Sequence, residues 1–320
     1  MVPYSVILFC EAKPANRLRY SMAHLAKTGK FKVWSTPSTE EGSVFANESY
    51  GNSSSTVVVG GRKVTVEDIA SVAVLMHSVS LDQSTIDKID TDLASSKVKI
   101  SFSHEELSTV TQNDRAIYDV AFCRAALFVR IVSLMVCRSG VRSEVVECLV
   151  ELLDSNVIPN FSSPELAGLE LCSILTGGNA TCFCNGELMS SLAAFAEADI
   201  TPIGLSDSEF STLKLGQFFS TGCICLVASG AANLGSMIDC VSALSCDTFG
   251  ISIEPFDAVH FDTCRPHRGQ IASATNLRLL LEGSKRTKNA NADPSFTDLV
   301  FGNIPQVHGP SLESISSIVK

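Results

Sequence analysis

The chain has 320 residues, of which 45% are hydrophobic and 18% charged, enough to bury one large core or two ordinary ones. Its formal net charge of -10 argues against a nucleic-acid partner, since phosphate binding needs a concentrated basic surface. Twelve cysteines without a recognisable secretory signal predict reduced thiols and a cytoplasmic protein.

The first 56 residues differ in composition from the rest. They hold six Lys and Arg residues against four Glu, whereas the remainder holds 18 basic and 30 acidic residues. The Ser/Asn/Gly-rich run "NESYGNSSST" predicts a linker that ends this segment. We therefore expect an α/β-like basic extension over 1–56 and one domain over 57–320. The basic, amphipathic stretch "NRLRYSMAHLAK" leaves a mitochondrial location as an alternative.

Helical periodicity begins at Thr65. In "TVEDIASVAVLM", Thr65 is expected to cap a helix and Asp68 to complete an acidic capping box. The apolar run over 114–138 predicts a long central helix, which Gly140 ends before the next helical segment, "RSEVVECLVELLDSN". The domain is therefore expected to be mainly α.

A short β-hairpin interrupts this helical pattern. In "ATCFCNGELMS", two short runs flank Asn185-Gly186, a strong signal for a two-residue hairpin turn. Helical periodicity returns over 207–246. No charge occurs from Leu215 to Ile238, but the polar side chains and glycines there favour a helix buried among helices over a membrane span.

The nearest approach to a metal site is "HFDTCRPH", with His260, Cys264 and His267. A fourth ligand is missing and no Cys-x-x-Cys pair occurs, so we expect no metal. The sequence also contains no P-loop and no G-x-G-x-x-G motif, which leaves a nucleotide-binding function without support.

Several segments, in order, resemble the histidine and phenylalanine ammonia-lyase family. They are "VTVEDIASVA", "SGVRSEVVECLVELLDSNVIP", "RPHRGQIASATNLRLLLEGS" and, most specifically, "IPQVHGP". The resemblance runs from about Val57 to the C-terminus. It implies a bundle of long helices, usually assembled as a tetramer whose active sites draw on three subunits. It also implies a truncated subunit, because family members continue well beyond "IPQVHGP".

The resemblance points to one loop as the place of the catalytic electrophile. In the family, Ala-Ser-Gly after V-I-P cyclises: the Gly nitrogen attacks the Ala carbonyl, and the loss of two waters, one from ring closure and one from the Ser hydroxyl, gives a methylidene-imidazolone. Here "VIPNFSSPELAG" places Ser162, Ser163 and Pro164 at that position. Ring closure needs a backbone N–H, which Pro164 lacks, so we expect no imidazolone cofactor. Ser163 is instead expected to cap a helix that begins at Pro164.

An intact Ala-Ser-Gly does occur elsewhere, at Ala228, Ser229 and Gly230. It falls inside the predicted long helix after "GQFF". A helical backbone is committed to hydrogen bonds four residues apart, whereas cyclisation needs a tight loop. This tripeptide therefore predicts close packing of small residues between helices.

The rest of the family's catalytic set is also depleted. The loop with the Tyr base has no counterpart, Leu215 replaces the substrate-side Asn, and "SFTDLVFGN" lacks the expected Tyr and Arg. His104 remains a candidate through the family's Ser-His pair, although a lone His on a polar helix end is more often simply solvated. No catalytic residue is otherwise expected.

These observations predict a catalytically inactive ammonia-lyase-like protein that acts by association, as a homo-oligomer or with a full-length lyase-like subunit. One alternative is an active histidine or aromatic amino acid ammonia-lyase with an atypical or shared site. Another is a structural component of a larger assembly. Nucleic acid and membrane partners are not expected.

Overall fold

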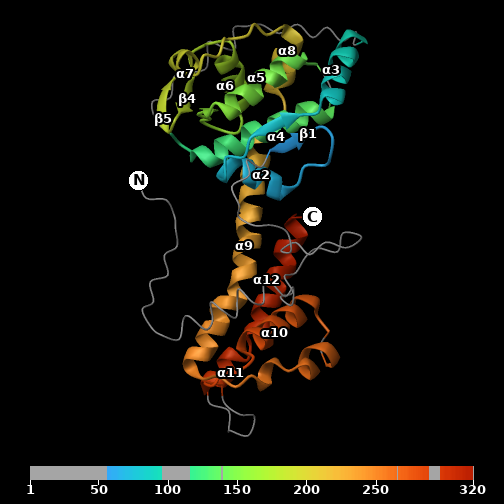
Figure 1. Cartoon of the computed structure of the whole chain (residues 1–320), viewed down its shortest axis with the longest axis vertical. Coiled ribbons are helices and arrows are strands. Elements are labelled where there is room, and N and C mark those ends of the chain that lie inside the picture. The colour runs from blue at the N-terminus through green and yellow to red at the C-terminus, as the bar shows by residue number, and fades with distance from the viewer. Residues whose placement is uncertain (1–55, 96–115, 138–139, 265, 288–295, 320) are drawn as a thin grey trace. The chain divides into compact units, whose positions relative to one another are not determined.

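A computed structural model describes residues 56–95, 116–137, 140–264, 266–287 and 296–319 (Figure 1). These residues form two compact units, 56–229 and 230–319, each with its own hydrophobic cluster. The predicted extension over 1–56, with its boundary, falls almost wholly outside the described residues and stays a prediction.

The unit over 56–229 is mainly helical, as predicted. Its helices are α2 (Val66–Val74), α3 (Gln83–Ser95), α4 (Val120–Cys137), α5 (Ser143–Asp154), α6 (Ala167–Leu175), α7 (Ser191–Ala198), α8 (Asp207–Lys214) and the first part of α9 (Phe218–Phe249). The predicted capping box at α2 is confirmed, since Thr65 N donates to Asp68 Oδ2 at 2.8 Å and Asp68 N donates to Thr65 Oγ1 at 3.2 Å.

Five short strands accompany these helices. β1 (Val57–Val59) pairs in parallel with β2 (Val79–Leu81), and β3 (Val157–Pro159), β4 (Thr181–Cys184) and β5 (Glu187–Ser190) form an antiparallel sheet in that order. Asn185 and Gly186 connect β4 to β5 with φ angles of 50° and 88°, so the predicted hairpin is confirmed. The parallel pair was not predicted, because a three-residue strand is too short to show an alternating pattern.

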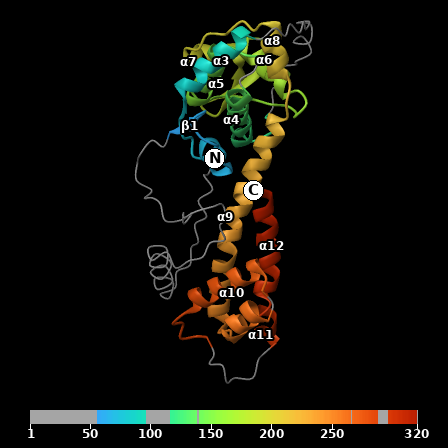
Figure 2. The same cartoon turned by 90° about the vertical axis from the view of Figure 1, so that its right-hand side faces the viewer.

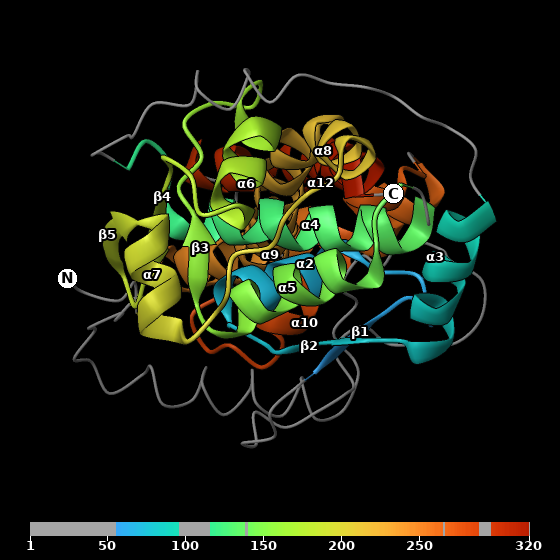
Figure 3. The same cartoon turned by 90° about the horizontal axis from the view of Figure 1, so that it is seen from above.

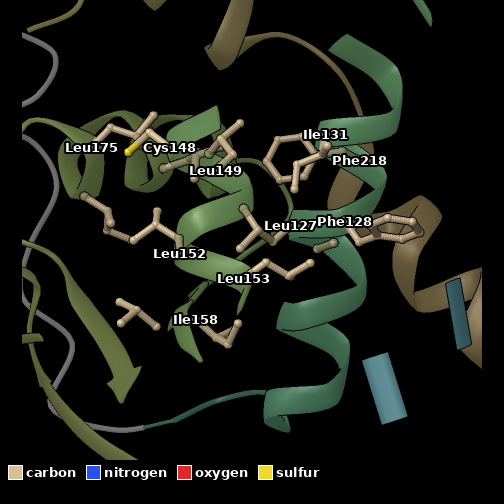
Figure 4. Close-up of a cluster of buried hydrophobic side chains, with 14 of the residues drawn as sticks. Leu127, Phe128, Ile131, Cys148, Leu149, Leu152, Leu153, Ile158, Leu175 and Phe218 are labelled. Atoms are coloured by element: carbon tan, nitrogen blue, oxygen red, sulfur yellow. The ribbon is translucent and has the colours of Figure 1, made fainter. Parts of the chain in front are cut away.

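Helix α4 is the central element of this unit and packs against α2 and α5 (Figure 3). Leu127 of α4 lies with Leu149 and Leu153 of α5 in the core between the two helices (Figure 4). The sequence predicted that this helix starts at residue 114, but it starts at Val120. The Asp119 carboxylate accepts the Ala121 N–H at 2.9 Å and so caps the helix at that point.

The unit over 230–319 contains the rest of α9, α10 (Arg268–Leu281), α11 (Phe296–Phe301), α12 (Ile304–Val319), a 3₁₀ turn (Glu254–Phe256) and a π-helix (Val259–Thr263). Figure 2 shows α12 beside α9, where a Cβ added to Gly235 would lie 2.8 Å from Leu312 Cδ2. The core of this unit joins Ala243 and Cys246 of α9 with Leu277 and Leu281 of α10.

By length and composition alone, α4 and the segment containing α9 could each cross a bilayer. For α4, burial of 56% of this span inside its unit accounts for the apolar composition. In the segment that contains α9, Asp207–Phe249, an apolar window of 18 residues is only 18% buried. Its exposed apolar side chains therefore need a different explanation.

Two glycines of α9 give a matched test of this packing. A Cβ at Gly222 would lie 2.7 Å from Ala126 N and 2.9 Å from Ala125 C of α4, whereas a Cβ at Gly230 meets nothing within 4 Å. We expect Gly222→Ala to lower the free energy of unfolding by about 1–3 kcal/mol through overpacking. Gly230→Ala should raise it by about 1 kcal/mol through helix propensity. Urea unfolding followed by circular dichroism measures both, and equal effects would contradict the observed close contact of α9 with α4.

Candidate functional site

The loop after β3 is the candidate site, because it contains the residues aligned with the electrophile. Its start is tied to β4: Asn160 N donates to Thr181 O, and Asn160 Nδ2 donates to Thr181 Oγ1, both at 3.0 Å. Phe161 follows, fully buried, with its ring edge-on to Phe218 and Phe219 at centroid distances of 5.8 and 5.5 Å. Backbone pairing and aromatic packing therefore hold the loop against the start of α9.

A buried carboxylate, Glu170 of α6, binds the first residue of the aligned tripeptide. Ser162 N donates to Glu170 Oε1 and Oε2 at 3.2 and 3.0 Å, and Ser162 Oγ also hydrogen-bonds Oε1. Burial raises the pKa of Glu170, and the hydrogen bonds from Ser162 oppose that rise only in part. Glu170 is not among the site residues expected from the sequence, although a single Glu inside the apolar run "LAGLELCSIL" is a visible signal.

Ser163 makes a capping hydrogen bond to the turn that follows it. Its Oγ accepts the Leu166 N–H at 3.2 Å, and its carbonyl accepts the Ala167 N–H at 3.0 Å. Residues 164–166 form a turn, and α6 begins at Ala167, three residues after the predicted start. Ser163 therefore caps the turn that precedes α6 and not α6 itself, whose N-cap is Leu166 and makes no side-chain capping hydrogen bond.

The intact Ala-Ser-Gly is helical, as predicted, since Ala228, Ser229 and Gly230 all lie within α9. The expected packing role is only partly present. Ala228 is buried, but Gly230 is exposed and has no neighbouring atom within the described residues where its Cβ would be. Within the part of the chain that the structure describes, no helix packs closely against Gly230.

The junction between α8 and α9 adjoins the loop. Leu215, where the resemblance implies an Asn, is 67% exposed and offers no hydrogen-bonding side chain. Arg130 is buried behind this junction, with its Nη2 donating to Thr212 O and its guanidinium 5.3 Å from the Phe218 ring centroid. Burial lowers the pKa of Arg130. The junction thus combines a buried cation, Arg130, with an exposed apolar side chain, Leu215.

The two most specific sequence motifs meet in the unit over 230–319. Asp239 of α9 is buried and accepts hydrogen bonds from Ser273 Oγ at 2.6 Å and Asn276 Nδ2 at 3.0 Å, and His308 Nδ1 lies 2.8 Å from its Oδ1. Ser273 and Asn276 follow "RPHRGQ" on α10, and His308 belongs to "IPQVHGP" on α12. This network joins three helices, and it could not be predicted from the sequence because its members are far apart in the chain.

The same motifs also bring two helix backbones together. Gly269 of α10 and Gly309 of α12 lie in close contact, and a Cβ added to Gly309 would lie 2.6 Å from Gln270 N. Such an approach excludes any side chain at either position. The Gly residues of both motifs therefore serve helix packing here.

The possible metal ligands do not converge among the described residues. His260 and Cys264 line a pocket of about 450 Å³ together with Gln270 and Asp298, whereas His267 is not part of its lining. No group of three or more His, Cys, Asp or Glu side chains suited to a metal occurs in the described part of the chain. The candidate His104 lies outside the described residues.

Comparisons with known proteins agree with the sequence resemblance. A family profile described as aromatic amino acid lyase matches residues 108–320. Histidine ammonia-lyase 2 of Fusobacterium nucleatum is 31% identical over 80% of this chain and 56% of its own length. A histidine ammonia-lyase of Streptococcus pyogenes is 29% identical over 81% of this chain and 57% of its own length. The chain thus spans little more than half of these relatives.

Solved structures share the fold. Phenylalanine aminomutase of Pantoea agglomerans superposes with a TM-score of 0.68 and 21% identity, over 82% of this chain and 60% of that one. Phenylalanine ammonia-lyase of Rhodosporidium toruloides gives a TM-score of 0.66 and 20% identity, over 83% and 45%. The predicted long-helix architecture is therefore confirmed.

The Glu170 environment predicts a pH dependence of stability. The pKa of Glu170 is higher in the folded chain than in the unfolded chain. At a pH between these two values, the folded chain holds a proton on Glu170 that the unfolded chain has lost. Stability should therefore fall as pH rises from the ordinary Glu pKa, about 4.3, to the raised value. Glu170→Gln should remove this fall and match or exceed the wild type at neutral pH, as measured by urea unfolding across that range.

Glu209 provides a control of opposite sign. Burial acts to raise its pKa, but the hydrogen bonds from Arg142 Nε, at 2.7 Å, and Ser206 N, at 2.8 Å, lower it overall. The ionised Glu209 therefore contributes to the stability of the fold above the ordinary Glu pKa, and this stabilisation is lost as pH falls through the lowered pKa. Glu209→Gln should therefore destabilise at neutral pH. A Glu170→Gln variant that behaves like Glu209→Gln would contradict the assignment for Glu170.

Proposed function

Because the chain belongs to the aromatic amino acid lyase family, we propose that it is a catalytically inactive member that acts by associating with other subunits in the cytoplasm. One observation carries the proposal: the position of the family's electrophile holds Ser162, Ser163 and Pro164. An active lyase with an atypical or shared site is the alternative that the experiments below distinguish.

The residues of this loop do not fit a methylidene-imidazolone. Its formation requires a backbone N–H at the third position to attack the first carbonyl, and the Pro164 nitrogen carries no hydrogen. The neighbouring hydrogen bonds also hold an uncyclised loop. Ser162 N–H is engaged by Glu170, and Ser163 Oγ, the hydroxyl that cyclisation would eliminate, accepts the Leu166 N–H.

The surroundings of the loop support the same proposal. An exposed Leu215 side chain cannot hydrogen-bond a substrate, and Leu299 and Gly302 stand in the segment where the resemblance implies Tyr and Arg. The best-preserved motifs instead supply the Asp239–His308 contact and the Gly269–Gly309 contact. In this chain the residues of these motifs thus take part in helix packing and in a buried hydrogen-bond network.

Association is supported by the exposed apolar surface of α9. Contiguous apolar surface is uncommon on soluble monomers and usually marks an interaction site. A second copy of this chain or a longer lyase-like subunit would both present helices suited to cover it. The proposal requires no metal, no cofactor and no nucleic acid.

The absence of an imidazolone is tested most directly by intact mass. We expect the purified protein to have the mass of its unmodified sequence, with no imidazolone absorbance band and no borohydride-sensitive adduct, because Pro164 blocks ring closure. A loss of one or two waters mapped by peptide analysis to 162–164 or 228–230 would overturn the proposal. A family member with an intact Ala-Ser-Gly loop is the positive control.

Replacing the proline alone should not create an enzyme. We expect Pro164→Gly to show no turnover of histidine, phenylalanine or tyrosine, since a missing general base typically costs about 10²–10⁴ in rate. Product formation followed by ultraviolet absorbance measures this. Activity in the Pro164→Gly variant would show that a base is present, and activity in the wild type would favour the alternative of an active lyase.

A further inference from the structure

Arg130 of α4 is a buried cation without a counter-ion among the described residues. It is 6% exposed, and its Nε atom is buried with no hydrogen-bond partner. Its contacts are with neutral groups: Nη2 donates to Thr212 O, and the guanidinium lies 5.3 Å from the Phe218 ring centroid. No described carboxylate forms an ion pair with it. An arginine stays charged at neutral pH and buried charges are normally paired, so this guanidinium favours an anion from outside the chain.

The guanidinium lies at the N-terminus of α9. This helix begins at Phe218, and Thr221 N donates to Gln217 O in its first turn. A Cβ added to the exposed Gly216, whose φ is 106°, would lie 3.4 Å from Arg130 Nη1. The first N–H groups of a helix have no acceptor inside the helix and form its positive end. A full charge and the positive end of a 32-residue helix therefore lie side by side.

A second side-chain cation belongs to the same junction. Lys214 is in the last turn of α8. Burial raises the pKa of the Cys172 thiol to about 12, and the charges of Arg130 and Lys214 oppose that rise, so both cations act on the same sulfur. Glu209 of α8 does not offset them, because Arg142 Nε binds its carboxylate at 2.7 Å. The junction over 214–218 therefore has an excess of positive charge.

These groups are suited to the oxygens of a phosphate. Guanidinium groups and helix N-termini both bind phosphate through N–H donors. A metal ion or an ammonium group would be repelled by the same charges. Because two side-chain cations and a helix end meet at the junction, a dianion gains more there than a monocarboxylate does.

We infer that the junction between α8 and α9 binds a phosphate group, free or as a monoester, between the Arg130 guanidinium and the N-terminal N–H groups of α9. Arg130 supplies the charge and Nη1 the donor beside Gly216. Binding is non-covalent. The site goes beyond the proposed role in association, and none of its residues takes part in ring closure at 162–164.

Titration calorimetry of the full chain with inorganic phosphate tests the site. At a pH of about 8, where phosphate is a dianion, and at constant ionic strength, we expect saturable binding to one site per chain. Acetate should bind at least about tenfold more weakly, because it carries one charge. Methyl phosphate distinguishes the two sources of the group: tighter binding than phosphate assigns the site to an ester, and weaker binding assigns it to free phosphate. No saturable phosphate binding, or equal binding of acetate, would overturn the inference.

Two exposed leucines give a matched pair of variants. Leu215 is 67% exposed and adjoins Gly216, whereas Leu192 is 58% exposed and lies on α7 of the same unit. We expect Leu215→Glu to raise the dissociation constant for phosphate at least about tenfold, because its carboxylate competes for the same cations. Leu192→Glu makes the same change in net charge and should bind as the wild type does. Equal effects of the two variants, or none, would contradict the site.

Arg130→Met removes the central charge. It should abolish phosphate binding, and circular dichroism checks that the variant keeps its helix content. A folded Arg130→Met protein that binds phosphate like the wild type would overturn the role of Arg130. Should this variant fail to fold, the leucine pair decides. The intact-mass experiment is independent of all these measurements, so a failure here is distinguishable from a failure of the proposed loss of catalysis.

Discussion

Helices in this protein meet at glycine, at distances that leave no room for a Cβ atom, and both units depend on this constraint. In the unit over 56–229, Gly222 lets α9 approach the backbone of α4, and Gly168 lets α6 approach Lys214 at the end of α8. In the unit over 230–319, Gly269 and Gly309 do the same for α10 and α12. Backbone contact at these points fixes which faces of the helices are buried, and thus which polar groups need internal partners.

The buried polar groups follow from that packing. Asp239 is taken out of water where α9, α10 and α12 meet, so Ser273, Asn276 and His308 must supply its hydrogen bonds. Glu170 is buried in the same way on α6, and the Ser162 backbone and hydroxyl satisfy it. The second contact bears on the proposed function, because Ser162 belongs to the loop that aligns with the family's electrophile.

Fold and chemistry have separate requirements in this protein. The long helices need apolar faces, small residues at crossings and a few buried hydrogen bonds, all of which are present. The family's reaction needs a cyclisable loop and a positioned base. A chain that keeps the first set and changes the second can retain the subunit architecture, and with it the surfaces through which subunits associate.

The sequence alone determined the features that depend on near neighbours. The Thr65–Asp68 capping box and the Asn185-Gly186 turn are local hydrogen-bond and φ preferences, and the missing N–H of Pro164 is a covalent fact. It could not give the Glu170 contact with Ser162, the partners of Asp239 or the open space beside Gly230, and it placed the start of α4 too early. Those features depend on which helix faces meet, because burial and hydrogen bonding between residues far apart in the chain are decided only when the helices pack.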